Sequence, residues 1–236
     1  MNAAPGPKPI YLLAGGPGAR RSDGDPLMTK VLASCGVPRP SIAYVGAASG
    51  DNQQFFLMIS DYMRECGAGQ VTLAPLAGRR VKIEKTRAIV ESADMILVSG
   101  GDVEAGMEIL EERQILPLLR ERYESGKSFL GISAGSIMLA RQWVLWEDPD
   151  DDATASAFPC MGLAAILCDT HGEDEGWEEL RTLLRLTEEG TFGYGIPSGA
   201  GLCVHADGAL EALGAPVHCF AKRSDRVVHD TDLPPL

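Results

Sequence analysis

One serine stands at the point where a predicted strand becomes a predicted helix. Ser133 lies in "GISAG" (residues 131–135), between the apolar "SFL" and a helix-compatible run. The G-x-S-x-G spacing is typical of a nucleophile elbow, a sharp turn that exposes the serine hydroxyl. The N–H of Ala134 would then face the oxyanion formed when Ser133 attacks a carbonyl carbon. The alternative is a serine that only caps the helix.

Two further groups have residue types that would complete such a site. Gly100 and Gly101 in "VSGGD" would let the backbone approach a ligand and offer a second N–H to the oxyanion, unless they form only a glycine-rich turn. His171, after "AILCD", is the right type and place for a general base to Ser133, although a lone histidine is more often structural. The other histidines compete with it for that role: His205, His218 and His229.

The elements that must position these groups alternate regularly. Apolar runs predict strands over residues 9–15, 41–49, 70–75, 95–102 and 127–133. Helical patterns lie between them, over 52–66 (capped by Asp51), 81–94, 103–126 (broken near Pro117) and 134–144. This alternation predicts an α/β fold, a mostly parallel sheet with helices on both faces. Sites in such sheets form at the carboxyl ends of the strands, where all three groups lie.

From about residue 160 the pattern changes to short, turn-punctuated strands around an amphipathic helix. Asp207-Gly208 is a plausible hairpin turn, so we expect a C-terminal β-hairpin region. We predict a flexible N-terminus over residues 1–8, a single domain over 9–228 and a frayed tail over 229–236.

Composition excludes several function classes. The chain has 236 residues, and 33 acidic against 21 basic side chains give a net charge of −12, which disfavours nucleic acid as a partner. The N-terminal residues lack a signal peptide or a membrane-spanning segment, so we expect a cytoplasmic protein without a membrane partner. The six cysteines form no CxxC pair and match no zinc spacing. We therefore expect reduced thiols and no metal site.

The motifs together resemble a known family. "MILVSGGD…GKSFLGISAGSIMLA", "GLAAILCDTH" and "GYGIPSGAGLCV" resemble successive blocks of the S51 serine peptidases, which include peptidase E and cyanophycinase. The similarity covers roughly residues 40–215. It implies the class I glutamine amidotransferase-like (flavodoxin-like) fold.

The resemblance also implies roles for individual residues. Ser133 would be the nucleophile and His171 its base, with the N–H groups of Gly101 and Ala134 as the oxyanion hole. The family's acid lies about fifteen residues past the serine, which corresponds here to Asp148, with Glu147 as the close competitor. Such an acid would orient the imidazole.

Three departures from the family concern the substrate. Asp102 replaces the usual Asn, Ser198 replaces a common acid, and acidic residues (173–175) follow the histidine where family dipeptidases have an aromatic and basic residues. We place Gly100, Asp102 and Ser198 at the substrate. Carboxylates around the pocket should repel an acidic substrate and favour a cationic or amine-bearing one.

These observations predict a serine hydrolase that cleaves a small peptide or amide bond through an acyl-enzyme, without a cofactor. A homodimer is compatible with this interpretation. The alternative is a catalytically inactive small-molecule binding or regulatory domain on the same fold. A glutamine amidotransferase is disfavoured because no cysteine stands at the elbow. An α/β-hydrolase is disfavoured because the acid and the histidine follow the serine too closely.

Overall fold

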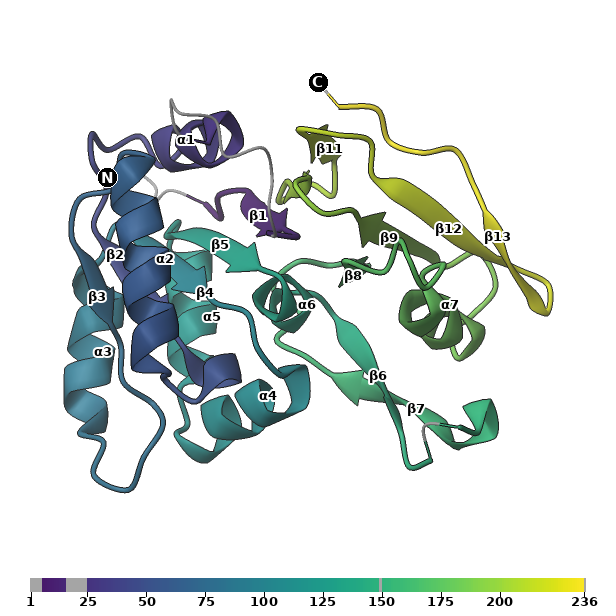
Figure 1. Cartoon of the computed structure of the whole chain (residues 1–236), viewed down its shortest axis with the longest axis horizontal. Helices are drawn as coiled ribbons and strands as arrows, with labels where there is room; N and C mark the ends of the chain where they lie inside the picture. The colour runs from purple at the N-terminus through teal and green to yellow at the C-terminus, as the bar shows by residue number, and fades with distance from the viewer. Residues whose placement is uncertain (1–5, 16–24, 149, 236) are drawn as a thin grey trace.

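A seven-stranded sheet with helices on both faces forms the centre of the molecule (Figure 1). The computed structural model describes residues 6–15, 25–148 and 150–235. The strand order is β11 (Leu210–Leu213), β10 (Gly201–Val204), β1 (Ile10–Leu13), β5 (Ser128–Ile132), β4 (Met95–Val98), β2 (Ile42–Val45) and β3 (Val71–Leu73). The five strands β1 to β5 are parallel to one another, β10 is antiparallel to β1, and β11 is antiparallel to β10. The predicted fold class is confirmed.

The remaining elements cover this sheet or extend from it. The helices are α1 (Pro26–Ala33), α2 (Gln53–Glu65), α3 (Ile83–Ser92), α4 (Val103–Glu112), α5 (Leu116–Glu124), α6 (Ala134–Leu139) and α7 (Glu178–Arg185), with 3-10 turns η1 (Ala47–Ser49) and η2 (Asp152–Thr154). A second sheet has the order β13 (Arg226–His229), β12 (His218–Arg223), β9 (Phe192–Ile196) and β8 (Leu167–Thr170). A third consists of β6 (Gln142–Trp146) and β7 (Ala155–Pro159). Within the described residues, no helix is both long and apolar enough to cross a bilayer.

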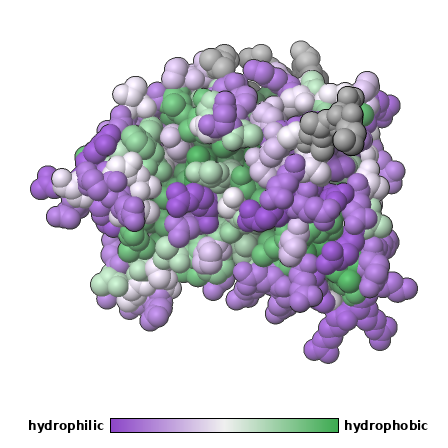
Figure 2. Space-filling model, turned by 180° about the vertical axis from the view of Figure 1, so that it is seen from behind, coloured by the Kyte–Doolittle hydropathy of each residue, from purple (hydrophilic) through white to green (hydrophobic). Residues whose placement is uncertain are grey.

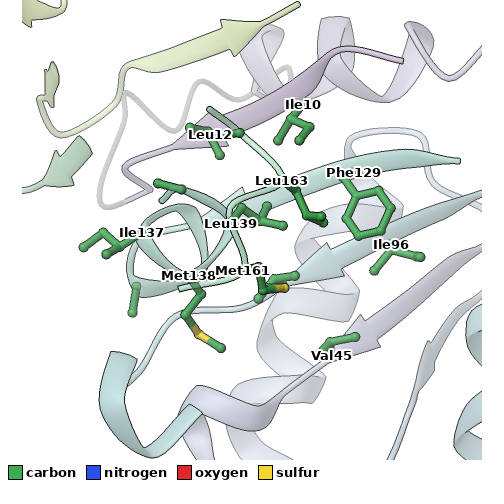
Figure 3. Packing of buried hydrophobic residues seen from close by; sticks show 14 of the residues in the cluster. Ile10, Leu12, Val45, Ile96, Phe129, Ile137, Met138, Leu139, Met161 and Leu163 are labelled. Carbon is green, nitrogen blue, oxygen red and sulfur yellow. The ribbon is translucent and has the colours of Figure 1, made fainter. Parts of the chain in front are cut away.

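The apolar strands are buried on both faces, as their sequences predict. Along β2, Ile42 and Tyr44 belong to one hydrophobic cluster, whereas Ala43 and Val45 belong to the other. This alternation follows from the two-residue period of a strand. Figure 3 shows the second cluster, in which α6 side chains such as Met138 lie among residues of the central strands. The short helix after the predicted elbow is therefore fixed by core packing.

Two local predictions are wrong. The helix predicted over residues 134–144 ends at Leu139, because the chain turns at Ala140 and continues as β6. Asp51 does not cap α2: its carboxylate accepts the N–H groups of Leu76 and Ala77, both at 2.6 Å, and Asn52 provides the cap.

Other local predictions agree with the structure. The helical run 103–126 is interrupted between α4 and α5, and Pro117 lies in the first turn of α5, where its missing N–H costs little. Asp207 and Gly208 connect the antiparallel strands β10 and β11, which confirms the hairpin.

The two chain ends lie only partly within the described residues. Of the predicted flexible N-terminus, residues 1–5 lie outside them, and Lys8 donates to the carbonyl of Cys35 at 3.0 Å. In the C-terminal segment, Leu233 exchanges backbone hydrogen bonds with Val217 at 2.9 and 3.0 Å. Figure 2 shows the face opposite to that of Figure 1, where hydrophilic side chains project beside exposed hydrophobic areas.

Candidate active site

Ser133 occupies a strained turn between β5 and α6. Its backbone has φ 53° and ψ −126°, a conformation that a residue with a side chain adopts only under constraint. Its N–H is held by the carbonyl of Leu13 at 2.9 Å. Of the ten residues from Gly131 to Ala140, Ser133 is the one that is not buried. The turn therefore presents this hydroxyl outward while its neighbours form core.

Small residues beside Ser133 allow the tight packing of strand and helix. A Cβ atom on Gly135 would lie 2.0 Å from the carbonyl oxygen of Val98, and one on Gly131 would lie 2.6 Å from the Cα of Ser136. Both contacts involve backbone, so neither can be relieved by moving a side chain. The first and last positions of the G-x-S-x-G motif thus need glycine for steric reasons.

Two backbone N–H groups near Ser133 have no hydrogen-bond partner among the residues that the structure describes. Those of Gly101 and Ala134 donate to no acceptor within the described part of the chain. Gly101 has φ 144°, and a Cβ there would lie 2.0 Å from the carbonyl oxygen of Ala48. That carbonyl also accepts the N–H of Asp102 at 2.8 Å, which fixes the loop after β4. The predicted oxyanion-hole residues are therefore rigidly held beside the serine.

A pocket of about 260 Å³ opens over Ser133. Its lining comes from the ends of β4, β5 and β8 and from α4, α6, α7 and β6. The lining residues are Gly101, Asp102, Val103, Glu104, Ser133, Ala134, Ile137, Trp143, Leu145, Asp169, Thr170 and Glu179. Apolar side chains form its walls, and the described residues that line it include four carboxylic acids and no basic side chain.

Two of these acids have raised pKa values. Burial, reinforced by the charge of Glu179, raises the pKa of Asp169 to about 7, and the N–H of Thr170, 2.6 Å from its Oδ1, opposes the shift only in part. Burial, and then the charges of Glu175 and Glu178, also raise the pKa of Glu179. The other two acids are more exposed, and Asp102 caps α4 through the N–H of Ala105.

His171 follows β8, whose last residue, Thr170, lines the pocket. It has φ 64°, and its N–H donates to the carbonyl of Ile196 at 3.3 Å. Its Nδ1 lies 2.9 Å from Oγ of Ser198. No hydrogen bond joins its ring to Ser133 in the described residues. The structure thus brings His171 to the same end of the sheets as Ser133, with its ring on Ser198.

The predicted acids Asp148 and Glu147 lie in the exposed loop between β6 and β7. The carboxylate of Asp148 accepts the N–H of Asp150 at 3.1 Å, within this loop. Neither acid is hydrogen-bonded to His171 among the described residues, and their roles stay predictions.

Gly100 lies directly beside the serine. A Cβ there would be 3.1 Å from that of Ser133.

Sequence reasoning missed several pocket residues. Trp143 was expected on a helix and Leu145 directly after it, but both lie on β6. Asp169 stands two residues before His171, and the two-residue period of a strand, which places alternate side chains on one face, was the signal available for it. Glu179 was missed because it is one of five acids between residues 173 and 179, and the other four are exposed.

Two side-chain groups elsewhere bring metal-ligating atoms within 4.8 Å of one another: Cys203, His205 and Glu211, and His218, His229 and Asp232. Neither includes Ser133 or His171.

Comparisons with known proteins identify the family. The sequence profile of peptidase family S51 matches residues 10–212. The chain belongs to this family. Among curated relatives of the S51 chain, Peptidase E of Pasteurella multocida is 34% identical over 67 residues, which are 28% of this chain and 29% of that protein. Pyridoxal 5'-phosphate synthase subunit PdxT of Hyperthermus butylicus is 38% identical over 58 residues, 25% of this chain and 29% of that protein.

Solved structures resemble the S51 chain over nearly its whole length. A peptidase from an acI-B1 Actinobacterium matches with a TM-score of 0.67 at 17% identity, over 98% of both chains. A putative Peptidase E from Listeria monocytogenes EGD-e matches with a TM-score of 0.62 at 14% identity, over 87% of this chain and 98% of its own. These two matches support the fold, and the matched family supports a peptidase-type protein.

Proposed function

We propose that this S51 chain is a serine-type hydrolase that cleaves a peptide or amide bond in a small substrate. The observation that carries the proposal is the partly exposed hydroxyl of Ser133 in an otherwise buried elbow, in one pocket with two N–H groups that have no acceptor among the described residues. An unpaired, rigidly held N–H pair beside a nucleophile is suited to a developing oxyanion.

The chemistry follows from these positions. Oγ of Ser133 attacks the substrate carbonyl carbon while Nε2 of His171 takes the hydroxyl proton, and the oxyanion accepts the N–H groups of Gly101 and Ala134. The imidazolium then gives its proton to the leaving amine as the C–N bond breaks, which leaves an acyl-enzyme. Water, deprotonated by the same Nε2, hydrolyses the ester. Catalytic hydrogen bonds are often long in ligand-free enzymes and tighten with substrate, so His171 needs to approach Ser133 only in the complex.

We further propose that the substrate carries an ammonium or guanidinium group. Four acids line the pocket, and the buried Asp169 is paired with no basic side chain in the described residues. A cation would supply the missing counter-charge, whereas an acidic side chain would be repelled. A space of about 260 Å³ is at the small end of ligand pockets, which favours a dipeptide or an amino-acid amide over a long chain.

The test is a screen of Lys-X, Arg-X, Ala-X and Asp-X dipeptides at neutral pH, with product amines quantified for wild type and Ser133→Ala. We expect turnover of the cationic substrates and none by the variant. Glu179→Gln should reduce the preference for Lys-X over Ala-X, whereas Glu188→Gln, outside the pocket, should preserve it. Turnover by Ser133→Ala would refute the nucleophile. Binding of the same dipeptides without turnover would favour the inactive binding domain.

A further inference from the structure

Ser198 and Glu173 form a connected hydrogen-bonded group on the side of His171 that the proposed proton transfer does not use. Nδ1 of His171 lies 2.9 Å from Oγ of Ser198. The backbone N–H of Ser198 donates to Oε1 of Glu173 at 2.8 Å. These two contacts connect an imidazole to a carboxylate through one serine, although the three residues come from two separate loops.

The loop that carries Ser198 is fixed in place. The N–H of Gly199 donates to the carbonyl of Gly15 at 3.1 Å, and that of Ala200 donates to the carbonyl of Pro197 at 2.9 Å. Gly15 follows β1, whose Leu13 carbonyl holds the N–H of Ser133. The same end of β1 therefore anchors both the nucleophile and the loop that contacts the imidazole.

The chemistry of Ser198 sets the direction of the hydrogen bonds. Partial burial of Glu173 disfavours its charge, but hydrogen bonding from Ser198 and the nearby His171 outweigh it and lower the pKa of Glu173. The backbone N–H of Ser198 serves the carboxylate, and a serine hydroxyl can accept as well as donate, so Oγ of Ser198 is available as the acceptor of Nδ1–H. In that arrangement the proton resides on Nδ1, and Nε2 is left free to accept the proton of Ser133.

We propose that Ser198, backed by the carboxylate of Glu173, is the positioning group for His171 in this chain. The inference rests on the proposed hydrolase function. Ser198 fixes the tautomer and the ring orientation, and Glu173 supplies the negative charge that stabilises the imidazolium formed when Ser133 is deprotonated. Both are positioning residues, because they act through His171. The resemblance gives this role instead to Asp148 or Glu147, neither of which contacts the ring among the described residues.

The experiment is a rate–pH profile of Ser133 labelling by a fluorophosphonate probe, between pH 5 and pH 9. The proteins are wild type, Ser198→Ala, Ser198→Asp and Glu173→Gln, with Glu175→Gln as the matched control and Asp148→Asn as the competing assignment. We expect Ser198→Ala to slow labelling at least about tenfold, part of the ~10²- to 10⁴-fold that a positioned base contributes. Ser198→Asp, which brings a carboxylate directly to Nδ1, should restore most of the rate.

The pH dependence of labelling distinguishes residues that position His171 from residues that only support the fold. Glu173→Gln keeps an acceptor for the N–H of Ser198 but removes the charge, so the acid limb of its profile should move to lower pH. Glu175→Gln and Asp148→Asn should keep the wild-type midpoint. A labelled wild type whose Ser198 and Glu173 variants behave identically to it would overturn this inference alone, as would a shift confined to Asp148→Asn. Unlabelled but folded wild type would refute the hydrolase function and this role with it.

Discussion

Replacing Asp169 by Asn should stabilise the protein at alkaline pH, because the buried carboxylate resists ionisation in the folded state. Burial and Glu179 raise the pKa of Asp169 from 3.8 to about 7. Between these values the unfolded chain is ionised at this site while the folded chain stays protonated. The contribution of Asp169 to the free energy of unfolding is therefore greatest below pH 3.8. It decreases as the pH rises from 3.8 to about 7.

The size of the effect follows from the shift. A difference of about three pH units, at ~1.36 kcal/mol per unit, corresponds to a total of about 4 kcal/mol. Of this, the part between pH 5 and pH 7 is about 3 kcal/mol. Above pH 7 both states are ionised at this site, so its contribution becomes constant. Asn cannot ionise, and its Oδ1 can still accept the N–H of Thr170, which removes the pH-dependent part without removing the hydrogen bond.

Urea denaturation of wild type and Asp169→Asn at pH 5 and pH 8 measures this difference. The free energy of unfolding of the variant minus that of wild type should be about 3 kcal/mol larger at pH 8 than at pH 5. The comparison cancels other titrating groups, and Asp174→Asn, at an exposed position, provides a control that should follow wild type. Parallel curves for wild type and Asp169→Asn would refute the argument that this carboxyl is buried without compensation.

Three further predictions concern the elbow. Gly135→Ala should lower the free energy of unfolding by about 3 kcal/mol in urea denaturation, because its Cβ would clash with the backbone of Val98. Gly6→Ala, where a Cβ meets no described atom within 4 Å, should leave this free energy nearly unchanged. Equal losses of stability in the two variants would contradict the close packing at Gly135. Ser133→Gly should be more stable than Ser133→Ala by about 1 kcal/mol, since glycine adopts φ 53° without strain; equal melting temperatures would argue against stored strain. Ser136→Ala should cost about 1 kcal/mol through loss of its 2.8 Å bond to the carbonyl of Leu13, and an unchanged stability would contradict that contribution.

The sequence predicts the central sheet because burial on both faces requires continuous apolar strands. Each predicted strand range contains an observed strand, for example "MILV" and "SFLGI". The observed strands are shorter than the predicted ranges because flanking glycines and polar residues do not take part in the strand pairing. The elbow is predictable for the same local reason: its glycines and its serine are contiguous in sequence. The predicted helix over 134–144 is wrong because the sequence is helix-compatible beyond Ala140, and pairing with β7 decides its conformation.

Contacts between distant segments are what the sequence does not reveal. Ser198 lies 27 residues from His171, and the hydrogen bond between them depends on the parallel pairing of β8 with β9. Asp169 is recognisable as a pocket residue only when the two-residue strand period is applied backward from His171. The sequence also places Asp148 at the distance expected of a triad acid, yet the β6–β7 hairpin holds it in a solvent-exposed loop.

The nucleophilic role of Ser133 is tested by labelling the wild-type protein with a fluorophosphonate, digesting it and locating the adduct by mass spectrometry. We predict a single adduct on Ser133, absent from Ser133→Ala and formed far more slowly by His171→Ala. Folded wild-type protein that forms no adduct, or forms it on another residue, would contradict the assignment of Ser133 as a nucleophile activated by His171.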